Sequence, residues 1–278
     1  MDHGLLFIDK EAGVTSRFVD NQIQRLFHTR KVGHLGTLDP FATGLLIVAV
    51  GSSTKYLPFL PDEEKTYEAV LRLGVKTDTA DLTGTIIEEK EAPNLDKNQI
   101  EAVLQSFLGK STQIPPMTSA IKKDGVALYK LAHKGEEVER EPRPIEIYDI
   151  KLLDYSSMEI RFQATVSKGT YIRVLGEDIA TALGTIGHLL SLRRLAVGTI
   201  GLEGSIPLDE AGEKDLRPAA DYVPYKHIEL NDEEAKKARN GVALKFDLSD
   251  VRILLTHEGN PLAIYEKCGE LYKCLRGL

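Results

Sequence analysis

Six consecutive aliphatic residues, Leu45–Val50, follow directly after the segment Gly33–Gly44. A short apolar run rich in branched side chains is typical of a strand buried in a core. The preceding segment, GHLGTLDPFATG, holds three glycines, one proline and one acidic residue, Asp39, which predicts a loop that enters the strand. Pro40 favours an extended backbone at Asp39. A carboxylate held in this way is a candidate nucleophile or general base. The alternative is a turn in which Asp39 only hydrogen-bonds to its own backbone.

The remaining hydrophobic pattern predicts both strands and helices. We expect further strands at Leu5–Lys10, Tyr67–Leu73, Thr85–Glu88, Ile145–Leu153, Met158–Val166 and, near the C-terminus, Val251–Leu255, Leu262–Glu266 and Leu271–Leu275. The segment Gly187–Leu195 leads to one more strand. Helical spacing and capping residues predict helices over Ser16–Phe27, Lys97–Leu108, Leu128–Lys134, Arg173–Leu183 and Asp232–Asn240, with a short helix that carries Lys55. The segment Pro207–Pro224 is typical of a linker with one short helix.

The length and the charge limit the class of protein. A chain of 278 residues exceeds one typical domain and predicts a large domain with a smaller one. The net charge of −7 argues against indiscriminate binding to nucleic acid. Positive residues nevertheless gather at a few places, which fits an RNA-binding cleft on an acidic body: Arg25, Arg30 and Lys31, then Lys122 and Lys123, then Arg193 and Arg194.

Two features indicate the cellular compartment. The apolar runs are too short to span a bilayer, and the N-terminus lacks a basic leader followed by a long apolar core, so we expect no membrane segment and no signal peptide. The two cysteines, Cys268 and Cys274, fit neither a zinc pattern nor a disulfide framework. They predict two buried, reduced thiols in a cytoplasmic protein.

Five motifs, in order and spacing, together resemble the bacterial tRNA pseudouridine synthases of the TruB type. They are the loop GHLGTLDPFATG and the segments Lys65–Tyr67, Leu73–Gly84, Ile114–Lys122 and Ser167–Arg173. The resemblance runs from Gly4 to the C-terminus and is strongest up to Arg194. It implies an α+β pseudouridine synthase fold, with a mixed, mostly antiparallel sheet, flanking helices and a small C-terminal PUA-like β-domain.

The same resemblance implies a division of the chain. A catalytic domain would cover residues 1–222, and a PUA-like RNA-binding domain would cover residues 225–278. An insertion at about 113–144, which is charged and broken by prolines, would be a thumb-like segment that grips RNA. On composition alone this insertion is equally an ordinary surface loop.

The resemblance makes Asp39 the catalytic aspartate. Converting uridine to pseudouridine breaks an N-glycosidic bond, rotates the uracil and forms a carbon–carbon bond without redox change, so we expect no cofactor and no metal. Asp39 would attack the sugar C1′, add to the uracil ring or remove a sugar proton. Arg173 would keep Asp39 ionised and oriented, and on a strand it would face the same side as Tyr171. Asp81 would approach the guanidinium from the other side, unless it only forms a turn.

Further residues would surround the substrate by the same resemblance. Tyr67, a catalytic residue, would stack on the uracil and offer its hydroxyl as a proton carrier. Tyr171 and Leu192 would form the pocket wall, and Lys55 would support the active-site loop. The alternatives are core side chains for the tyrosines and the leucine, and a surface lysine for Lys55.

A uridine inside a folded RNA loop must leave its stack before chemistry, which costs a few kcal/mol. His34, five residues before Asp39, resembles the histidine that occupies the vacated space. Zinc binding at His34 is not expected, because the sequence has no partner ligands nearby.

We therefore predict a cofactor-free, cytoplasmic, monomeric tRNA pseudouridine synthase that binds the T-arm and modifies uridine 55 by base flipping. Two alternatives stay open. One is a non-catalytic tRNA-binding or tRNA-folding chaperone on the same scaffold. The other is a glycoside hydrolase that uses Asp39 and Asp81 as its carboxylate pair. Neither a chaperone nor an isomerase changes the mass of the RNA, whereas a hydrolase adds water and releases a fragment.

Overall fold

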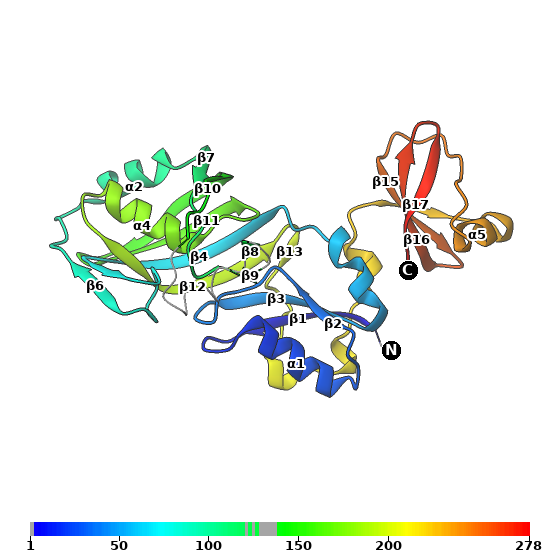
Figure 1. Ribbon diagram of the computed structural model, residues 1–278, viewed down its shortest axis with the longest axis horizontal. Coiled ribbons are helices and arrows are strands. Elements are labelled where there is room, and N and C mark those ends of the chain that lie inside the picture. Colours follow the sequence, from blue (N-terminus) through cyan, green and yellow to red (C-terminus); the bar gives the residue numbers. More distant parts are fainter. Residues whose placement is uncertain (1–2, 120–121, 124–125, 128–137) are drawn as a thin grey trace.

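A large twisted sheet forms the centre of the computed structural model, which describes residues 3–119, 122–123, 126–127 and 138–278. Seven strands follow the order β1-β3-β12-β4-β11-β10-β7, with β2 paired to β3 and β13 paired to β12 (Figure 1). Their bounds are β1 Gly4–Lys10, β2 Val32–Leu35, β3 Thr43–Val50, β4 Glu64–Leu73, β7 Gly109–Gln113, β10 Arg143–Tyr155, β11 Glu159–Ser167, β12 Gly187–Val197 and β13 Ile200–Gly201. All of these pairings are antiparallel except that of β12 with β3. The mixed, mostly antiparallel sheet that we expected is confirmed.

The aliphatic run Leu45–Val50 lies in β3, and both faces of this strand are covered. Its even-numbered residues belong to one hydrophobic core and its odd-numbered residues to another. Successive residues of a strand point to opposite faces, so a continuous apolar run is what a strand buried on both sides requires. Each of the buried leucine, isoleucine and valine side chains in this run stabilises the fold by about 1.5–3 kcal/mol. The loop that precedes β3 is therefore fixed to a rigid element.

Among the described residues, the four α-helices begin and end within two residues of the predicted bounds. The α-helices are α1 Ser16–Leu26, α2 Lys97–Ser106, α4 Ile172–Ala182 and α5 Asp232–Arg239, and the 3₁₀ helix η1 covers Gly51–Phe59. The Thr15 hydroxyl caps α1 by accepting from the Phe18 N–H at 3.0 Å. At α2, Asp96 and Gln99 form a reciprocal capping box. Gly184 follows α4 with a φ of +85°, a conformation that favours glycine.

The last part of the chain forms a separate four-stranded sheet, which lies apart from the large sheet in Figure 1. Its strands are β14 Lys226–Glu229, β15 Arg252–His257, β16 Asn260–Cys268 and β17 Leu271–Gly277. Ile253 and Tyr265 belong to its own core. Their neighbours on the same strands, Leu254 and Ile264, share a core with Phe59 of η1. One face of the small sheet therefore packs against the rest of the protein.

The segment between β7 and β10 leaves the large sheet and returns to it at the same point, because Gln113 is the register partner of Arg143. Within it, the short strands β8 Lys122–Lys123 and β9 Val126–Ala127 pair with each other. The helix expected over residues 128–134 lies outside the described residues. The thumb-like role of this insertion stays a prediction.

The predicted burial of the two cysteines is wrong, because Cys268 and Cys274 are both exposed on the strands of the small sheet. Two further local expectations were incomplete. The segment 207–224 contains three 3₁₀ turns rather than one short helix: η2 Leu208–Glu210, η3 Glu213–Asp215 and η4 Ala219–Tyr222. Prolines at 207 and 218 directly precede two of these turns and keep them short. The strands β5 Val75–Thr77 and β6 Ile86–Glu89 form a small hairpin. Only its second strand was expected. In the described part of the chain, no helix has the length and apolar character needed to cross a membrane.

Candidate active site

Asp39 lies on the loop between β2 and β3, and neighbouring elements hold this loop in place. Ser16, buried at the start of α1, donates from its hydroxyl to the Leu38 carbonyl at 3.1 Å and accepts from the Leu38 N–H at 2.9 Å. The side chain of Asp39 is 33% exposed. Its carboxylate does not bond to its own turn, because its hydrogen bonds come from Arg173. The turn-forming alternative for Asp39 is therefore wrong.

Arg173 donates hydrogen bonds to both carboxylate oxygens of Asp39. Its Nε donates to Asp39 Oδ2 at 2.9 Å and its Nη2 to Oδ1 at 3.3 Å, while only 3% of the Arg173 side chain is exposed. The remaining donors bond to the Thr79 carbonyl and to Thr118, through both its hydroxyl and its carbonyl, at 2.6–2.9 Å. A planar donor set that three further oxygens hold in place can fix a carboxylate in one orientation. The contact expected between Arg173 and Asp39 is present.

Arg173 lies in the helix that the sequence predicts over Arg173–Leu183, so the strand geometry considered for its pairing with Tyr171 does not apply. Tyr171 is the N-cap residue of α4, and Arg173 is the second residue of that helix. The two side chains therefore do not share a strand face. Helical geometry instead directs Arg173 back over the helix N-terminus, where the loop that carries Asp39 lies.

Asp81 reaches the same guanidinium from the other side. Its Oδ2 lies 3.7 Å from Arg173 Nη1, and the side chain is almost fully buried. Its other oxygen accepts from the Thr79 hydroxyl at 2.9 Å, from the Thr83 N–H at 2.9 Å and from the Thr83 hydroxyl at 2.5 Å. Asp81 thus forms a local turn and also places a second carboxylate beside Arg173. Because its oxygens are buried and occupied, it is not available as the second open carboxylate of a glycoside hydrolase.

Burial raises the pKa of Asp39 above its ordinary value, and the charge of Asp81 adds to the increase. Arg173 opposes this through its charge and its hydrogen bonds, and Lys10 opposes it through its charge. The carboxyl group of Asp39 is therefore held in a balance between burial and two cations, and its protonation is sensitive to each of these neighbours.

A buried lysine supports the loop, but it is Lys10 rather than Lys55. Lys10 Nζ donates to the carbonyls of Glu11, Val14 and Pro40 at 2.8, 2.8 and 3.2 Å. Burial lowers the pKa of Lys10 to about 8. Lys55 is exposed on η1, and its side chain forms no hydrogen bond or ion pair with any described residue. The support expected from Lys55 is therefore not seen.

Arg194 stabilises the Asp39 loop through hydrogen bonds to the loop backbone. Its side chain is completely buried, and it donates to the Gly36 carbonyl at 2.8 Å and to the Leu45 carbonyl at 2.7 Å. These two carbonyls lie on either side of Asp39. Gly44 makes the close approach possible, since a Cβ there would lie 2.3 Å from the Arg194 carbonyl oxygen, and its φ of +97° also favours glycine.

Tyr67 and Leu192 share one face of the sheet with Arg194. In the pairing of β12 with β4, Leu192 is opposite Ala69 and Arg194 is opposite Tyr67, and residues two apart on a strand point the same way. Burial raises the pKa of Tyr67, although the charge of Arg194 opposes the increase. The Tyr67 phenol therefore stays protonated near neutral pH and is a proton donor rather than a base.

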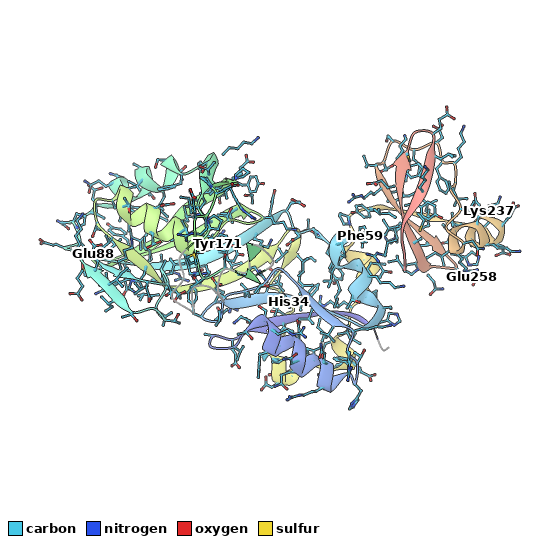
Figure 2. The ribbon with its side chains drawn as sticks, viewed as in Figure 1. His34, Phe59, Glu88, Tyr171, Lys237 and Glu258 are labelled. Atoms are coloured by element: carbon cyan, nitrogen blue, oxygen red, sulfur yellow. The ribbon has the colours of Figure 1, made fainter. Side chains whose placement is uncertain are left out.

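Tyr171 is fixed by its backbone. Its N–H donates to Gln113 Oε1 at 2.8 Å and its carbonyl accepts from Gln113 Nε2 at 3.1 Å. Burial also raises the pKa of its phenol, and the charge of Asp39 adds to this increase. The side chain is therefore near enough to Asp39 to sense its charge. Figure 2 shows Tyr171 beside the middle of the large sheet.

His34 lies on β2 and is partly buried, with both ring nitrogens occupied (Figure 2). Nδ1 lies 2.9 Å from Oδ2 of Asp20 on α1, and Nε2 lies 3.0 Å from the Thr37 hydroxyl. Through these contacts the histidine joins α1 to the Asp39 loop. A base-flipping role for His34 stays a prediction.

Sequence reasoning missed the roles of Lys10 and Thr118, and its placement of Arg194 was wrong. Arg194 was expected at an RNA-binding cleft, but its side chain is completely buried and donates to backbone carbonyls. Thr118 lies inside a motif that was already recognised, Ile114–Lys122, but no role was assigned to it. Arg194 is two residues from Leu192, so the strand period alone indicates that it faces the same side as that predicted wall residue. No local signal distinguishes Lys10 from a surface lysine at the end of a strand. Within the described residues, no group of three or more His, Cys, Asp or Glu side chains is arranged to hold a metal ion.

Comparison with known proteins gives one consistent result. Residues 24–172 match the family described as TruB family pseudouridylate synthase (N terminal domain). A protein of Geotalea uraniireducens (strain Rf4) named tRNA pseudouridine synthase B is 42% identical over 248 residues, covering 86% of this chain and 80% of that protein. A protein of Oceanobacillus iheyensis with the same name is 38% identical over 280 residues, covering 95% of this chain and 92% of that protein. Among solved structures, a chain of a Cbf5-Nop10-Gar1 complex matches with a TM-score of 0.74 and 23% identity, over 99% of this chain and 84% of that chain.

Proposed function

The chain belongs to the TruB family, has the pseudouridine synthase fold and is a tRNA pseudouridine synthase, and we propose that its target is uridine 55 in the T-loop. The relatives' names support tRNA as the substrate. The position in the tRNA rests on the resemblance of the sequence motifs to the bacterial enzymes.

One observation carries the chemistry that we assign: the two-point contact of Arg173 with Asp39, with Asp81 on the far side of the guanidinium. The reaction needs one ionised carboxylate at the target nucleotide, whether this attacks C1′, adds to the ring or removes a sugar proton. Asp39 is the partly exposed carboxylate of this group, so it is the one that substrate can reach. Arg173 orients Asp39 and favours its ionised form.

The substrate base would enter beside Asp39 after leaving the RNA stack. We propose that His34, held by Asp20 and Thr37, occupies the space that the base vacates and offsets part of the flipping cost. Tyr67 would then stack on the extruded uracil, with its phenol protonated. Leu192 and Tyr171 would enclose the base.

RNA outside the target nucleotide would contact two further parts of the chain. We assign the thumb-like role to the insertion between β7 and β10, and a PUA-like RNA-binding role to the four-stranded C-terminal sheet. The position of the insertion supports the first assignment, since its connection at Gln113 adjoins Tyr171 through two hydrogen bonds.

The test uses one unmodified tRNA transcript, a second transcript with cytidine at position 55, and the enzyme with and without Asp39→Asn. We expect a single carbodiimide-dependent stop at position 55, no change in RNA mass, and no stop with either the variant enzyme or the substituted transcript. A stop at another uridine would refute the position. Water addition with release of free base would indicate a hydrolase, and tight binding without any modification would indicate a chaperone.

A further inference from the structure

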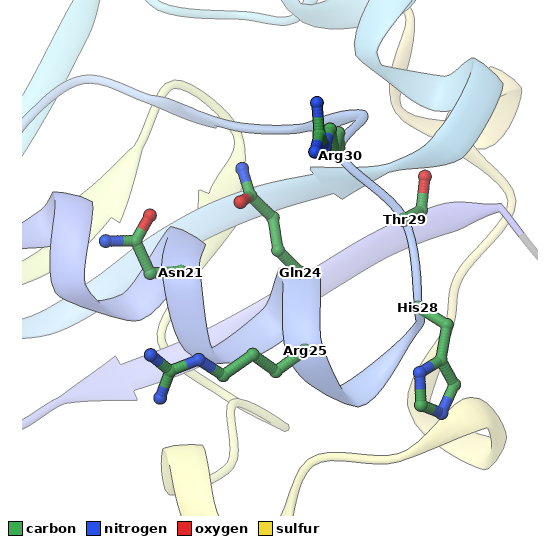
Figure 3. Close-up of a pocket in the computed structure, with 6 residues that line it drawn as sticks. All are labelled: Asn21, Gln24, Arg25, His28, Thr29 and Arg30. Carbon is green, nitrogen blue, oxygen red and sulfur yellow. The ribbon is translucent and has the colours of Figure 1, made fainter.

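A polar cavity of about 390 Å³ lies beside the C-terminal half of α1, outside the group of residues described above. Six residues line it: Asn21, Gln24, Arg25, His28, Thr29 and Arg30 (Figure 3). They come from the last turns of α1 and from the short connection to β2. The lining contains two guanidinium groups, one imidazole and two side-chain amides, and it contains no acidic residue. Every one of its charged groups is thus a potential hydrogen-bond donor to an anion.

The two arginines of this cavity have no protein partner among the described residues. Arg25 and Arg30 are exposed, and neither side chain makes a hydrogen bond or an ion pair there. By contrast, Arg17 on the same helix pairs with Asp20 at 3.5 Å, and Arg193 pairs with Asp9 at 2.7 Å. In a chain with 42 acidic and 35 basic residues, two unpaired guanidiniums in one cavity leave a local positive site on an acidic protein.

The backbone carbonyls at the C-terminal end of α1 do not accept hydrogen bonds from the side chains that line the cavity. The carbonyls of Ile23, Gln24 and Arg25 accept from the N–H groups of Phe27, Thr29 and His28 at 3.0, 3.1 and 3.3 Å. These three backbone carbonyls are therefore hydrogen-bonded within the chain. The side chains that line the cavity stay available to a ligand.

The cavity is aligned with the candidate active site along one row of α1. Residues four apart on a helix lie above one another, and such a row of α1 runs from Ser16 through Asp20 to Gln24. Ser16 holds the residue before Asp39, and Asp20 holds His34. Gln24 and His28 line the cavity. Two steps of four residues, at 1.5 Å per residue, place the cavity about 12 Å from the Asp39 loop.

We propose that this cavity binds a phosphodiester group of the RNA strand that flanks the target nucleotide. The inference rests on the proposed function, since it needs RNA lying across His34. Two guanidiniums match the geometry of a phosphate, and the amides of Asn21 and Gln24 add neutral donors. The site would set the path of the RNA backbone and would carry no sequence information. Inorganic phosphate shares this chemistry, so the experiment must separate the two sources.

The first arm of the test compares two double variants with the same charge change. Arg25→Gln with Arg30→Gln alters the cavity, and Lys90→Gln with Lys151→Gln alters two exposed lysines that also lack partners among the described residues. We expect the arginine variant to bind tRNA about tenfold more weakly and to lower the slope of log K against log salt by about 1. Turnover at saturating tRNA and the melting temperature should not change. The lysine control should keep both affinity and slope.

The second arm locates the phosphate. A series of T-arm RNAs carries one neutral methylphosphonate at each position around the target uridine. We expect one position to weaken binding to the wild-type enzyme but not to the arginine variant, which is the coupling that a direct contact produces. Millimolar inorganic phosphate should compete with RNA only weakly. Full competition by phosphate would assign the cavity to the free ion and overturn the proposal.

The proposal is also overturned if both double variants lose affinity equally, or if no methylphosphonate position couples to the arginines. Failure of the proposed function is distinguishable, because it would show as absent modification of uridine 55. Affinity, salt slope and coupling are all measured without turnover.

Discussion

Replacing Arg173 with lysine keeps the charge but removes the planar set of donors. The guanidinium makes five hydrogen bonds, two to Asp39 and three to Thr79 and Thr118. A lysine ammonium carries its donors on one nitrogen, so it cannot reach both Asp39 oxygens and both threonines. We expect Arg173→Lys to leave Asp39 with no more than one of its two charge-assisted hydrogen bonds.

The size of the effect follows from the bond that is lost. A hydrogen bond to a charged group contributes about 1.5–3 kcal/mol, and about 1.36 kcal/mol corresponds to tenfold in rate. If the second bond to Asp39 matters only in the transition state, kcat should fall by about 10- to 150-fold. The lost threonine contacts should lower the free energy of unfolding by about 1–3 kcal/mol. Affinity for tRNA should change by less than about tenfold, because the buried guanidinium is not part of the RNA-binding surface.

The assay is single-turnover pseudouridine formation at saturating enzyme, together with a tRNA binding curve and a melting temperature. Arg193→Lys is the matched control, since Arg193 makes the same kind of two-point contact, to Asp9 at 3.0 and 2.7 Å. That side chain is 37% exposed, and exposed pairs contribute at most about 1 kcal/mol. We expect turnover of the control within about fivefold of wild type. Near-normal turnover of Arg173→Lys, or equal losses in both variants, would refute the orienting role of Arg173.

Three further outcomes follow from the same geometry. Asp39→Asn should abolish pseudouridine formation while tRNA affinity, measured by filter binding, stays within about tenfold, or 1.4 kcal/mol; retained turnover would remove the catalytic assignment. Asp81→Asn should shift the acid limb of the kcat/KM profile to lower pH, because the charge of Asp81 raises the pKa of Asp39 and the active, ionised form is lost as pH falls through that pKa; a shift to higher pH would contradict this. His34→Ala should slow the modification of a folded T-arm more than that of a short unstructured RNA with the same uridine, because only the folded substrate pays the flipping cost; equal losses would count against flipping.

Local patterns predicted the elements but not how they meet. The run Leu45–Val50 indicated a buried strand, and Asp96 marked the start of a helix, because both signals lie within a few residues of the structure that they determine. The contact of Asp39 with Arg173 joins residues 134 positions apart. No periodicity or capping rule reaches that far, so only the family resemblance brought this pair together. Local helical spacing, in contrast, correctly predicted that Arg173 lies near the start of a helix, α4.

The sequence predicted that Lys55 supports the active-site loop, whereas the structure assigns this role to Lys10, and the reason for this error is similar. The sequence alone does not distinguish a lysine whose ammonium group is in solvent from one whose ammonium group donates to backbone carbonyls. Lys10 acquires its role because the chain turns at Glu11–Val14 and brings Pro40, 30 residues away, within 3.2 Å of its Nζ. Only the closed loop creates the three acceptors that make burial of this ammonium tolerable.

Three buried cations, Lys10, Arg173 and Arg194, surround the loop that carries Asp39. Burying a charge costs several kcal/mol unless fixed partners replace water, and here the partners are mainly backbone carbonyls, at Pro40 for Lys10 and at Gly36 for Arg194. The loop conformation supplies the carbonyl acceptors that stabilise the buried charges. The hydrogen bonds that these cations donate in turn stabilise the loop conformation. The positive field at Asp39 is therefore present before substrate arrives. That field partly offsets the burial that raises the pKa of Asp39, so it favours the ionised form of a carboxylate that substrate can still reach. The stability of the loop and the reactivity of Asp39 therefore depend on the same contacts.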